Sequence, residues 1–227
     1  MGKKRCFGVK LISVLEWRAR VIGTAQYAQD GRGPSIWDTF AHNNKTFNGD
    51  NGDIADDSYN KLECDIALLK QLGVNSYRFS ISWSRMFPGG VGTLNPHAVA
   101  HYNKVIDMLL ANQITPLVTL FHWDLPQALE DKYRGWLDRR IVIDFTEYAD
   151  ACFAAFGDRV KMWVTLNEPW TYCLHGYITG IFAPGRCTDR SRCAAGDSSI
   201  EGYLAGHHML LSHASAVHHY RTKYATQ

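Results

Sequence analysis

Hydrophobic and polar positions alternate between two periods along the chain from about residue 55 onward. Four segments carry apolar residues three or four positions apart, which is typical of one buried face of an amphipathic helix. These segments cover residues 57–72, 96–110, 141–156 and about 200–224. Apolar runs that alternate or are nearly continuous lie between them, at 75–84, 114–121 and 160–166, and predict three strands.

Polar residues mark where the predicted helices begin. Asn95 followed by Pro96 is typical of an N-cap with proline at the first helical position. Asp56 or Asp57 is the expected N-cap of the first helix, and Asp138 that of the third. These capping residues lie where the periodic patterns place the starts of helices, so both signals predict strands and helices that succeed one another along the chain.

Strand and helix units repeat about every 40 residues, which favours right-handed crossovers and an all-parallel sheet. The fold class is therefore α/β, and a (β/α)8 TIM barrel is one architecture that such repeated units build. With residues 21–25 as a first strand, the chain has four such units. A complete barrel takes about 250 residues or more, so we expect about the first four βα units. We assign 1–20 to an N-terminal segment and 21–227 to a partial barrel domain.

Composition and charge exclude several classes of protein. Of the 227 residues, 46% are hydrophobic, which is enough for a packed core. Lys plus Arg number 24 against 22 for Asp plus Glu, so the chain lacks the positive excess that nucleic-acid binding requires. No apolar run approaches the roughly 18 residues of a membrane span. We expect neither a nucleic-acid nor a membrane partner, and the oligomeric state has no readable signal.

Two features bear on the compartment and leave it open. Residues 3–5 are basic and precede an apolar stretch like that of a signal peptide or leader, but Lys10 interrupts it and no clean cleavage site follows. Among the six cysteines, Cys187 and Cys193 are close together in a polar loop and are the ones placed to pair. A disulfide there would favour an oxidising, extracellular location, whereas free thiols would favour the cytoplasm.

Chemically useful side chains collect where the predicted strands end. The three ends read WSR at 83–85, HWD at 122–124 and NEPW at 167–170. In parallel α/β folds, ligands bind beyond the carboxyl ends of the strands. Aromatic rings can pack on the C–H faces of a sugar while amide, imidazole and carboxyl groups bind its hydroxyls. Because proline follows Glu168, we expect extended backbone at that residue.

The same segments resemble the successive motifs of glycoside hydrolase family 1, the β-glucosidase family. The resemblance rests on YRFSISWSR at 77–85, LFHWDLP at 120–126 and TLNEPW at 165–170. The segments DGRGPSIWD at 30–38, APGR at 183–186 and the histidine pair at 207–208 fit the same family in the same order. The match covers about residues 23–224, and the ordered set is much more specific than any one segment.

The resemblance implies a (β/α)8 TIM barrel and a retaining β-glycosidase that hydrolyses terminal β-D-glucosyl residues of small-molecule or oligosaccharide β-glycosides, without metal or organic cofactor. In the family, the glutamate of the NEP motif is the general acid/base, here Glu168. Asn167 corresponds to the residue that binds the sugar 2-hydroxyl, and His122 and Trp123 resemble those on the 3-hydroxyl side. Arg78 resembles the strand arginine whose charge keeps the catalytic carboxylates ionised.

Two departures from the family pattern put parts of this function in doubt. The family nucleophile lies in a Thr-Glu-Asn-Gly motif, and these 227 residues contain no such sequence. A catalytically incompetent, truncated half-barrel or a sugar-binding remnant is therefore the alternative function. The segment that carries a sugar-binding glutamine in the family is shortened here, so whether Gln26 or Gln29 replaces that glutamine stays open.

Structural explanations compete with the functional ones at several positions. Arg78 could simply neutralise neighbouring carboxylates, and Trp123 could be a core ring, as we expect for Trp83 and Trp163. The five histidines between positions 207 and 219 do not have the spacing that places two metal ligands on one helix face. We therefore assign no metal site.

Overall fold

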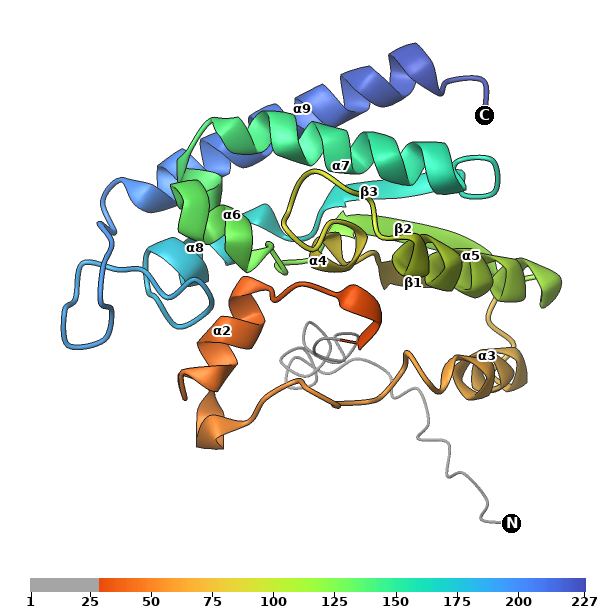
Figure 1. Cartoon of the computed structure of the whole chain (residues 1–227), viewed down its shortest axis with the longest axis horizontal. Helices are drawn as coiled ribbons and strands as arrows, with labels where there is room; N and C mark the ends of the chain where they lie inside the picture. The colour runs from red at the N-terminus through yellow and green to blue at the C-terminus, as the bar shows by residue number, and fades with distance from the viewer. Residues whose placement is uncertain (1–28) are drawn as a thin grey trace.

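The computed structural model describes residues 29–227, and Figure 1 shows the chain. The expected strand at 21–25 and the N-terminal segment 1–20 lie outside the described residues. The elements in chain order are η1 Gln29–Gly31, α2 Ile36–His42, η2 Phe47–Gly49, α3 Leu62–Gln71, β1 Ser76–Ser80, α4 Trp83–Met86, α5 Pro96–Ala111, β2 Thr115–Phe121, α6 Gln127–Tyr133, η3 Gly135–Leu137, α7 Arg140–Phe156, β3 Met162–Leu166, α8 Pro169–Tyr177 and α9 Glu201–Lys223. None of these helices has the length and apolar character needed to cross a bilayer.

Strands β1, β2 and β3 form one parallel sheet in that order. In its register, Arg78 pairs with Leu117 and Thr119 pairs with Val164. Helices separate the strands in sequence, because parallel neighbours need a long crossover connection. The structure confirms the predicted α/β class and parallel sheet. All three strands end at the same edge, so the segments that follow them lie side by side.

The outer face of the sheet carries the main hydrophobic core. Helices α7 and α9 run side by side along this part of the molecule (Figure 1), and the Phe153 ring of α7 packs edge-on against Trp163 of β3 at 5.0 Å. The hydroxyl of Tyr148 lies 3.0 Å from the carbonyl oxygen of Ile81 and 2.8 Å from that of Leu120. This one buried side chain therefore connects the ends of β1 and β2 to α7.

Residues of the opposite sheet face include Arg78 of β1 and Thr119 of β2, which the parallel register places on the same side. Thr119 is fully buried, whereas Arg78 is exposed. Met162 at the start of β3 is 41% exposed. A second, smaller cluster of apolar side chains joins α3 and α5 to the start of β2. The helices thus cover the outer face more completely than the face that carries Arg78.

Two predicted boundaries were wrong. The run at 75–84 is a strand only as far as Ser80. Ser82 is the N-cap of the short helix α4, and its backbone N–H donates to the hydroxyl of Tyr102 at 2.8 Å. Helix α3 begins at Leu62 and not at residue 57. Asp57 has a φ of +56°, and its carbonyl oxygen accepts from Lys61 at 3.1 Å. It forms a turn ahead of the helix and does not cap it.

Other helix ends follow from local side-chain chemistry. Asn95 caps α5, since its side-chain oxygen accepts from the backbone N–H of His97 at 3.0 Å. The Asp138 carboxylate accepts from the backbone N–H of Arg140 at 2.9 Å and supports the start of α7. Sequence analysis missed α2, although Ser35 and Asp38 form a capping box at its start. It also missed α6 and α8.

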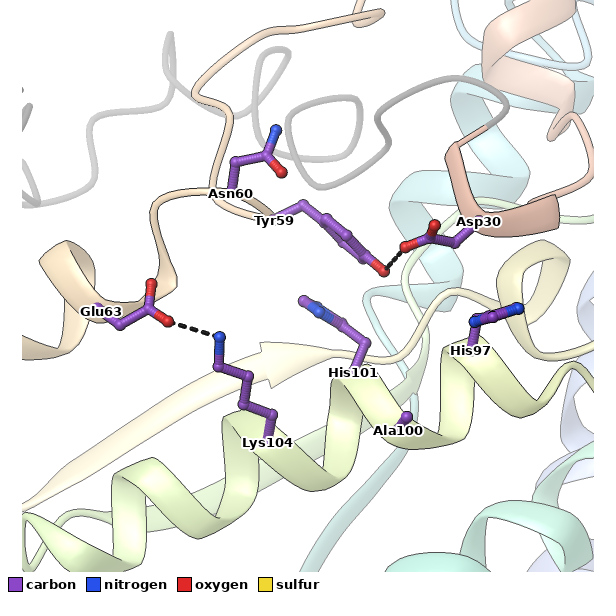
Figure 2. Close-up of a pocket in the computed structure, with 8 residues that line it drawn as sticks. All are labelled: Asp30, Tyr59, Asn60, Glu63, His97, Ala100, His101 and Lys104. Carbon is purple, nitrogen blue, oxygen red and sulfur yellow. Dashed lines mark hydrogen bonds and ion pairs between the residues drawn. The ribbon is translucent and has the colours of Figure 1, made fainter.

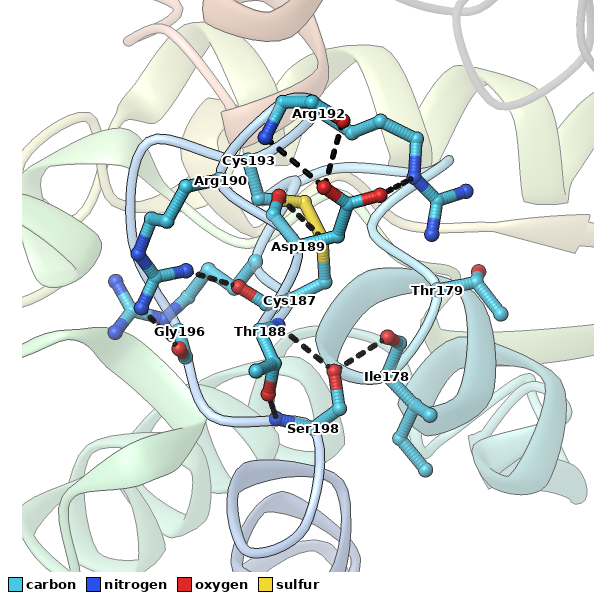
Figure 3. Close-up of a disulfide and its surroundings, with 12 residues drawn as sticks. Ile178, Thr179, Cys187, Thr188, Asp189, Arg190, Arg192, Cys193, Gly196 and Ser198 are labelled. Carbon is cyan, nitrogen blue, oxygen red and sulfur yellow. Dashed lines mark hydrogen bonds and ion pairs between the residues drawn. A yellow bond between two sulfur atoms is a disulfide. The ribbon is translucent and has the colours of Figure 1, made fainter.

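A cross-linked loop connects α8 to α9 (Figure 3). A disulfide joins Cys187 to Cys193. Thr188 and Ser198 exchange backbone-to-hydroxyl hydrogen bonds of 2.9 and 2.8 Å, and the Ser198 hydroxyl also donates to the carbonyl oxygen of Ile178 at 2.7 Å. The loop is therefore fastened to the end of α8, where Gly180 follows with a left-handed φ of +69°.

Substitution of Gly180 by alanine is expected to destabilise the fold through both backbone and steric effects. A Cβ atom there would lie 2.1 Å from the sulfur of Cys193. The left-handed backbone alone costs a non-glycine residue about 1–2 kcal/mol. Gly180→Ala should therefore reduce the free energy of unfolding by more than that amount, as measured by urea denaturation.

Gly73 provides a matched control for this prediction. Its φ of +68° is nearly the same, but a Cβ atom there would have nothing within 4 Å. Gly73→Ala should show the backbone penalty alone. If the two variants lose equal stability, the contact between residue 180 and the cross-linked loop contributes nothing.

Candidate active site

The ends of β2 and β3 bring together the residues that the sequence singled out. The backbone N–H of Asn167 donates to the carbonyl oxygen of Phe121 at 2.9 Å. In the other direction, the indole N–H of Trp123 donates to the carbonyl oxygen of Asn167 at 2.8 Å. These two bonds hold the segment with His122 against the segment with Glu168, as expected from adjacent parallel strands.

Trp123 and Glu168 share an unusual backbone conformation. Their φ angles are +74° and +41°, in the left-handed region that side chains other than glycine seldom adopt. The extended backbone expected at Glu168 was therefore wrong. Pro169 instead occupies the first turn of α8, and the carbonyl oxygen of Glu168 accepts from Tyr172 at 3.0 Å. Non-glycine residues in this region cluster at functional sites, and both lie at the same edge of the sheet.

Asn167 is buried, with 4% exposure, and only the oxygen of its side-chain amide has a hydrogen-bond partner among the described residues. Its oxygen accepts from an Nη of Arg78 at 2.5 Å. Its nitrogen Nδ2 is buried and meets no acceptor among residues 29–227. Arg78 also donates through Nε to the hydroxyl of Thr119 at 2.9 Å. The hydrogen bonds of Arg78 thus go to an amide and a hydroxyl.

His122 lies at the end of β2 and is partly buried. Burial, reinforced by the positive charge of Arg78, lowers the pKa of its imidazole to about 4. The ring is therefore neutral at pH 7, with one nitrogen able to donate and the other able to accept. Such a group can bind a hydroxyl in either direction without adding charge to the site.

Trp123 is almost completely buried, with 1% exposure. Its ring packs against Phe182 at 5.4 Å and Tyr172 at 6.2 Å. Its one hydrogen-bond donor is already used on the carbonyl oxygen of Asn167. Trp83 is fully buried and Trp163 packs against the main core, as expected for both.

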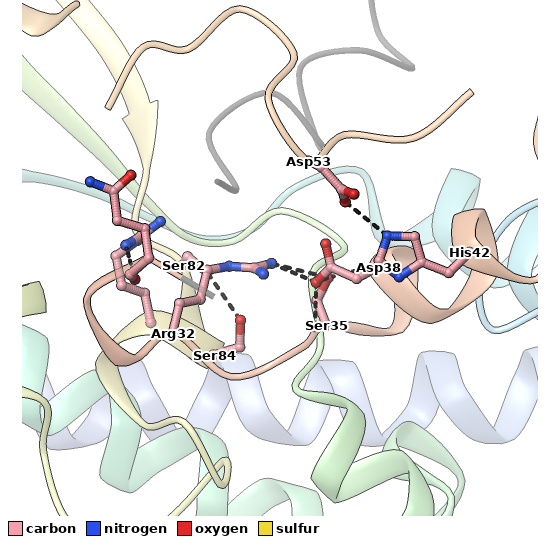
Figure 4. A network of polar contacts seen from close by, with 9 residues as sticks. Arg32, Ser35, Asp38, His42, Asp53, Ser82 and Ser84 are labelled. Atoms are coloured by element: carbon pink, nitrogen blue, oxygen red, sulfur yellow. Dashed lines mark hydrogen bonds and ion pairs between the residues drawn. The ribbon is translucent and has the colours of Figure 1, made fainter. Parts of the chain in front are cut away.

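A buried polar network that sequence analysis missed supports this edge of the sheet (Figure 4). Arg32 and Asp38 form an ion pair of 2.8 Å with side chains 2% and 3% exposed, and the Ser35 hydroxyl donates to Asp38 at 2.8 Å. Burial raises the pKa of the nearby Asp124 to about 6, and the charge of Arg32 opposes that rise. Arg32, Ser35 and Asp38 all lie in the segment at 30–38, so the signal for their contacts was present in the sequence, whereas Asp124 is distant from them in sequence.

The backbone continues this connection to the strand ends. The N–H of Ile36 donates to the carbonyl oxygen of Leu125 at 2.8 Å, and Ser35 forms an antiparallel bridge with Pro126. The N–H of Gly33 donates to the carbonyl oxygen of Ser84 at 2.9 Å. The segment before α2 is thus fastened to the segments that follow β1 and β2.

A separate pocket of about 430 Å³ lies beside α5 (Figure 2). Tyr59 stacks on His101 with ring centroids 3.9 Å apart, and Lys104 pairs with Glu63 at 2.5 Å. Its lining residues are Asp30, Tyr59, Asn60, Glu63, His97, Ala100, His101 and Lys104. None of the expected sugar-binding residues lines this pocket, so it is distinct from the cluster at the strand ends.

Comparison with known proteins agrees with the motifs and the geometry. The family model described as glycosyl hydrolase family 1 matches residues 21–227. Beta-glucosidase 6 from Oryza sativa subsp. japonica is 55% identical over 219 residues, covering 91% of this chain and 42% of the relative. Furcatin hydrolase from Viburnum furcatum is 53% identical, covering 89% of this chain and 39% of the relative.

Solved structures lead to the same result. A rice β-glucosidase crystal structure is 57% identical and superposes with a TM-score of 0.85, covering 87% of this chain and 42% of that one. A β-glucosidase from the fungus Humicola insolens in complex with glucose is 49% identical, with a TM-score of 0.85 and coverage of 86% and 42%. The chain spans about two fifths of the length of these relatives.

The parallel sheet, its outer helices and these superpositions define the fold as part of a (β/α)8 barrel. The chain belongs to glycosyl hydrolase family 1 and is a homologue of β-glucosidases.

The depressed pKa of His122 makes a prediction about stability and pH. Between about pH 6.5, its ordinary pKa, and pH 4, the unfolded chain binds a proton that the folded chain does not. The contribution of His122 therefore lowers the free energy of unfolding as pH falls through this range. Urea denaturation should show this loss in the parent relative to His122→Gln, and NMR should show His122 titrating near pH 4.

Arg78→Met tests the cause of the shift. Removal of the positive charge should raise the pKa of His122, but not to its ordinary value, because burial is the larger cause. A His122 resonance that titrates near pH 6.5 in the parent would contradict the assignment.

Proposed function

We propose that this chain supplies the sugar-binding and acid/base portion of a retaining β-glucosidase. It would act on terminal β-linked glucose in a small-molecule or oligosaccharide glycoside. The membership of the family and the resemblance to β-glucosidases support the class of reaction. The arrangement at the ends of β2 and β3 supports the roles of individual residues.

The buried Nδ2 group of Asn167 is the observation that carries the proposal. A buried donor without a partner costs about 1–3 kcal/mol relative to a satisfied one. In a sugar complex the 2-hydroxyl oxygen would accept from this N–H, and the bond would strengthen in the transition state. The neutral imidazole of His122 would bind the hydroxyl at C3. Trp123 would contribute mainly by holding Asn167 through the indole hydrogen bond.

Glu168 would act twice in the reaction. Its protonated carboxyl donates a proton to the leaving oxygen while a second carboxylate attacks the anomeric carbon and forms a glycosyl intermediate. The Glu168 carboxylate then accepts a proton from water as that water displaces the second carboxylate. The two carboxyl groups must be about 5 to 5.5 Å apart. Glu168 is exposed at the strand end, where substrate and a partner carboxylate can reach it.

Sugar binding without hydrolysis is the second candidate function. It is favoured by the buried Nδ2 group of Asn167, whose contact with a sugar hydroxyl requires no nucleophile. The two candidates share the contacts to the glycone and differ in whether a nucleophile completes the site. Binding and hydrolysis must therefore be measured separately.

Binding is tested with methyl β-D-glucoside on the 227-residue chain by saturation-transfer NMR and calorimetry. Asn167→Ala should weaken binding about threefold to tenfold, which corresponds to the loss of one hydrogen bond. Asn75→Ala is the matched control, because Asn75 is exposed and precedes β1 at the opposite edge of the sheet. Equal affinities of parent and Asn167→Ala would remove Asn167 from the site.

Hydrolysis is tested in a chimera that joins this chain to the carboxyl-terminal portion of the 55% identical rice relative. The chimera should cleave an aryl β-glucoside, and Glu168→Gln should reduce kcat by about 10²-fold or more. Azide should restore turnover of the variant and yield a glycosyl azide, because it attacks the intermediate without general-base assistance. Unchanged turnover in Glu168→Gln would exclude Glu168 as the acid/base.

A further inference from the structure

The contact between Arg78 and Asn167 fixes which end of the amide the site can offer. The nitrogen and oxygen of an amide are nearly indistinguishable by shape, so hydrogen-bond partners decide the orientation. A guanidinium group has donors and no acceptor. The atom that lies 2.5 Å from the Nη of Arg78 must therefore be the oxygen of Asn167. Rotation of the amide would bring an N–H group against another N–H group.

Arg78 is itself held in place. Its Nε donates to the hydroxyl of Thr119 at 2.9 Å, and Thr119 is fully buried on the neighbouring strand. The backbone of Asn167 is also fixed on both sides, by Phe121 at 2.9 Å and by the Trp123 indole at 2.8 Å. The amide can neither move away from Arg78 nor rotate without the loss of a hydrogen bond.

We propose that Arg78 is a specificity-determining positioning residue that turns the N–H group of Asn167 toward the substituent at C2 of the sugar. The site then requires an acceptor at C2. A hydroxyl oxygen provides one, whereas a 2-deoxy sugar provides none and a 2-ammonium group presents only donors. The inference rests on the proposed function, since it assigns the basis of selectivity to one contact within the same site.

This role differs from the general electrostatic role that the family resemblance implies for Arg78. Loss of a purely electrostatic or structural arginine would weaken the binding of all glycosides by a similar factor. Loss of an arginine that orients the amide would reduce the preference between glycosides that differ only at C2. The ratio of two affinities therefore separates the explanations.

The first experiment needs no ligand. Carbon-13 and nitrogen-15 NMR of the 227-residue chain would monitor the side-chain amide of Asn167 in the parent, Arg78→Met and Arg78→Lys. Arg78→Met should shift the Cγ resonance upfield and speed amide hydrogen exchange, and Arg78→Lys should show a smaller change. Arg221→Met, an exposed residue near the end of α9, is the control. An unchanged amide in a folded Arg78→Met protein overturns the proposal.

The second experiment compares methyl β-D-glucoside with its 2-deoxy and 2-amino analogues by calorimetry at pH 6. The parent should prefer the 2-hydroxyl compound to the 2-deoxy compound about threefold to tenfold. Arg78→Met should bring this ratio close to one. Asn167→Asp, which keeps an oxygen toward Arg78 and presents a second oxygen in place of the N–H, should shift the preference toward the 2-ammonium compound.

The outcomes separate the two proposals. If Arg78→Met retains the parent ratio, the inference fails and the proposed function stands. If the parent binds none of the three compounds, sugar binding by this chain fails, while the NMR experiment still decides whether Arg78 orients the amide.

Discussion

Parallel pairing of β2 with β3 is the constraint on which the candidate site depends. It brings the end of one strand beside the end of the next, so that residues 45 positions apart in sequence, His122 and Asn167, share one edge. The exchange of hydrogen bonds beyond the last ladder pair extends this pairing into the loops. The positions of the polar groups thus follow from the pairing of the sheet backbone.

Support for that edge comes from two different kinds of interaction. On the outer side, the Tyr148 hydroxyl and the stacked Trp83 ring hold the strand ends against α7 through the core. On the other side, backbone hydrogen bonds from Gly33 to Ser84 and from Ile36 to Leu125 anchor the segment before α2. The ion pair of Arg32 with Asp38 holds that segment to the start of the helix. A buried ion pair gains little net stability, because desolvation offsets the attraction. Its contribution here is geometric, since it fixes the path of the chain between Arg32 and Asp38.

The sequence predicted those features that depend on periodicity and on short motifs. The three strands, the long helices and the cap at Asn95 follow from patterns within a few residues. Features that depend on tertiary contacts could not be predicted. The alternating pattern predicts a strand at Trp83, but this residue begins helix α4. Contact with β2 ends before it, at the hydrogen bond from the N–H of Ile81 to the carbonyl oxygen of Thr119. Glu168 adopts a left-handed backbone because it connects β3 directly to the first turn of α8. Asn167, the hydrogen-bond partner of Arg78, lies 89 positions away in sequence.

The left-handed conformation of Glu168 and Trp123 has a consequence for protein engineering. At both positions glycine is the residue that the backbone conformation favours, so a search for stabilising substitutions guided by backbone geometry alone would select glycine. At Glu168 that choice would delete the carboxyl group, and at Trp123 it would remove the indole that holds Asn167. Under the proposed function, backbone stability and activity are opposed at Glu168, whereas at Trp123 the loss of a buried core ring would itself destabilise the fold. Variant libraries for improved stability should therefore keep both residues fixed.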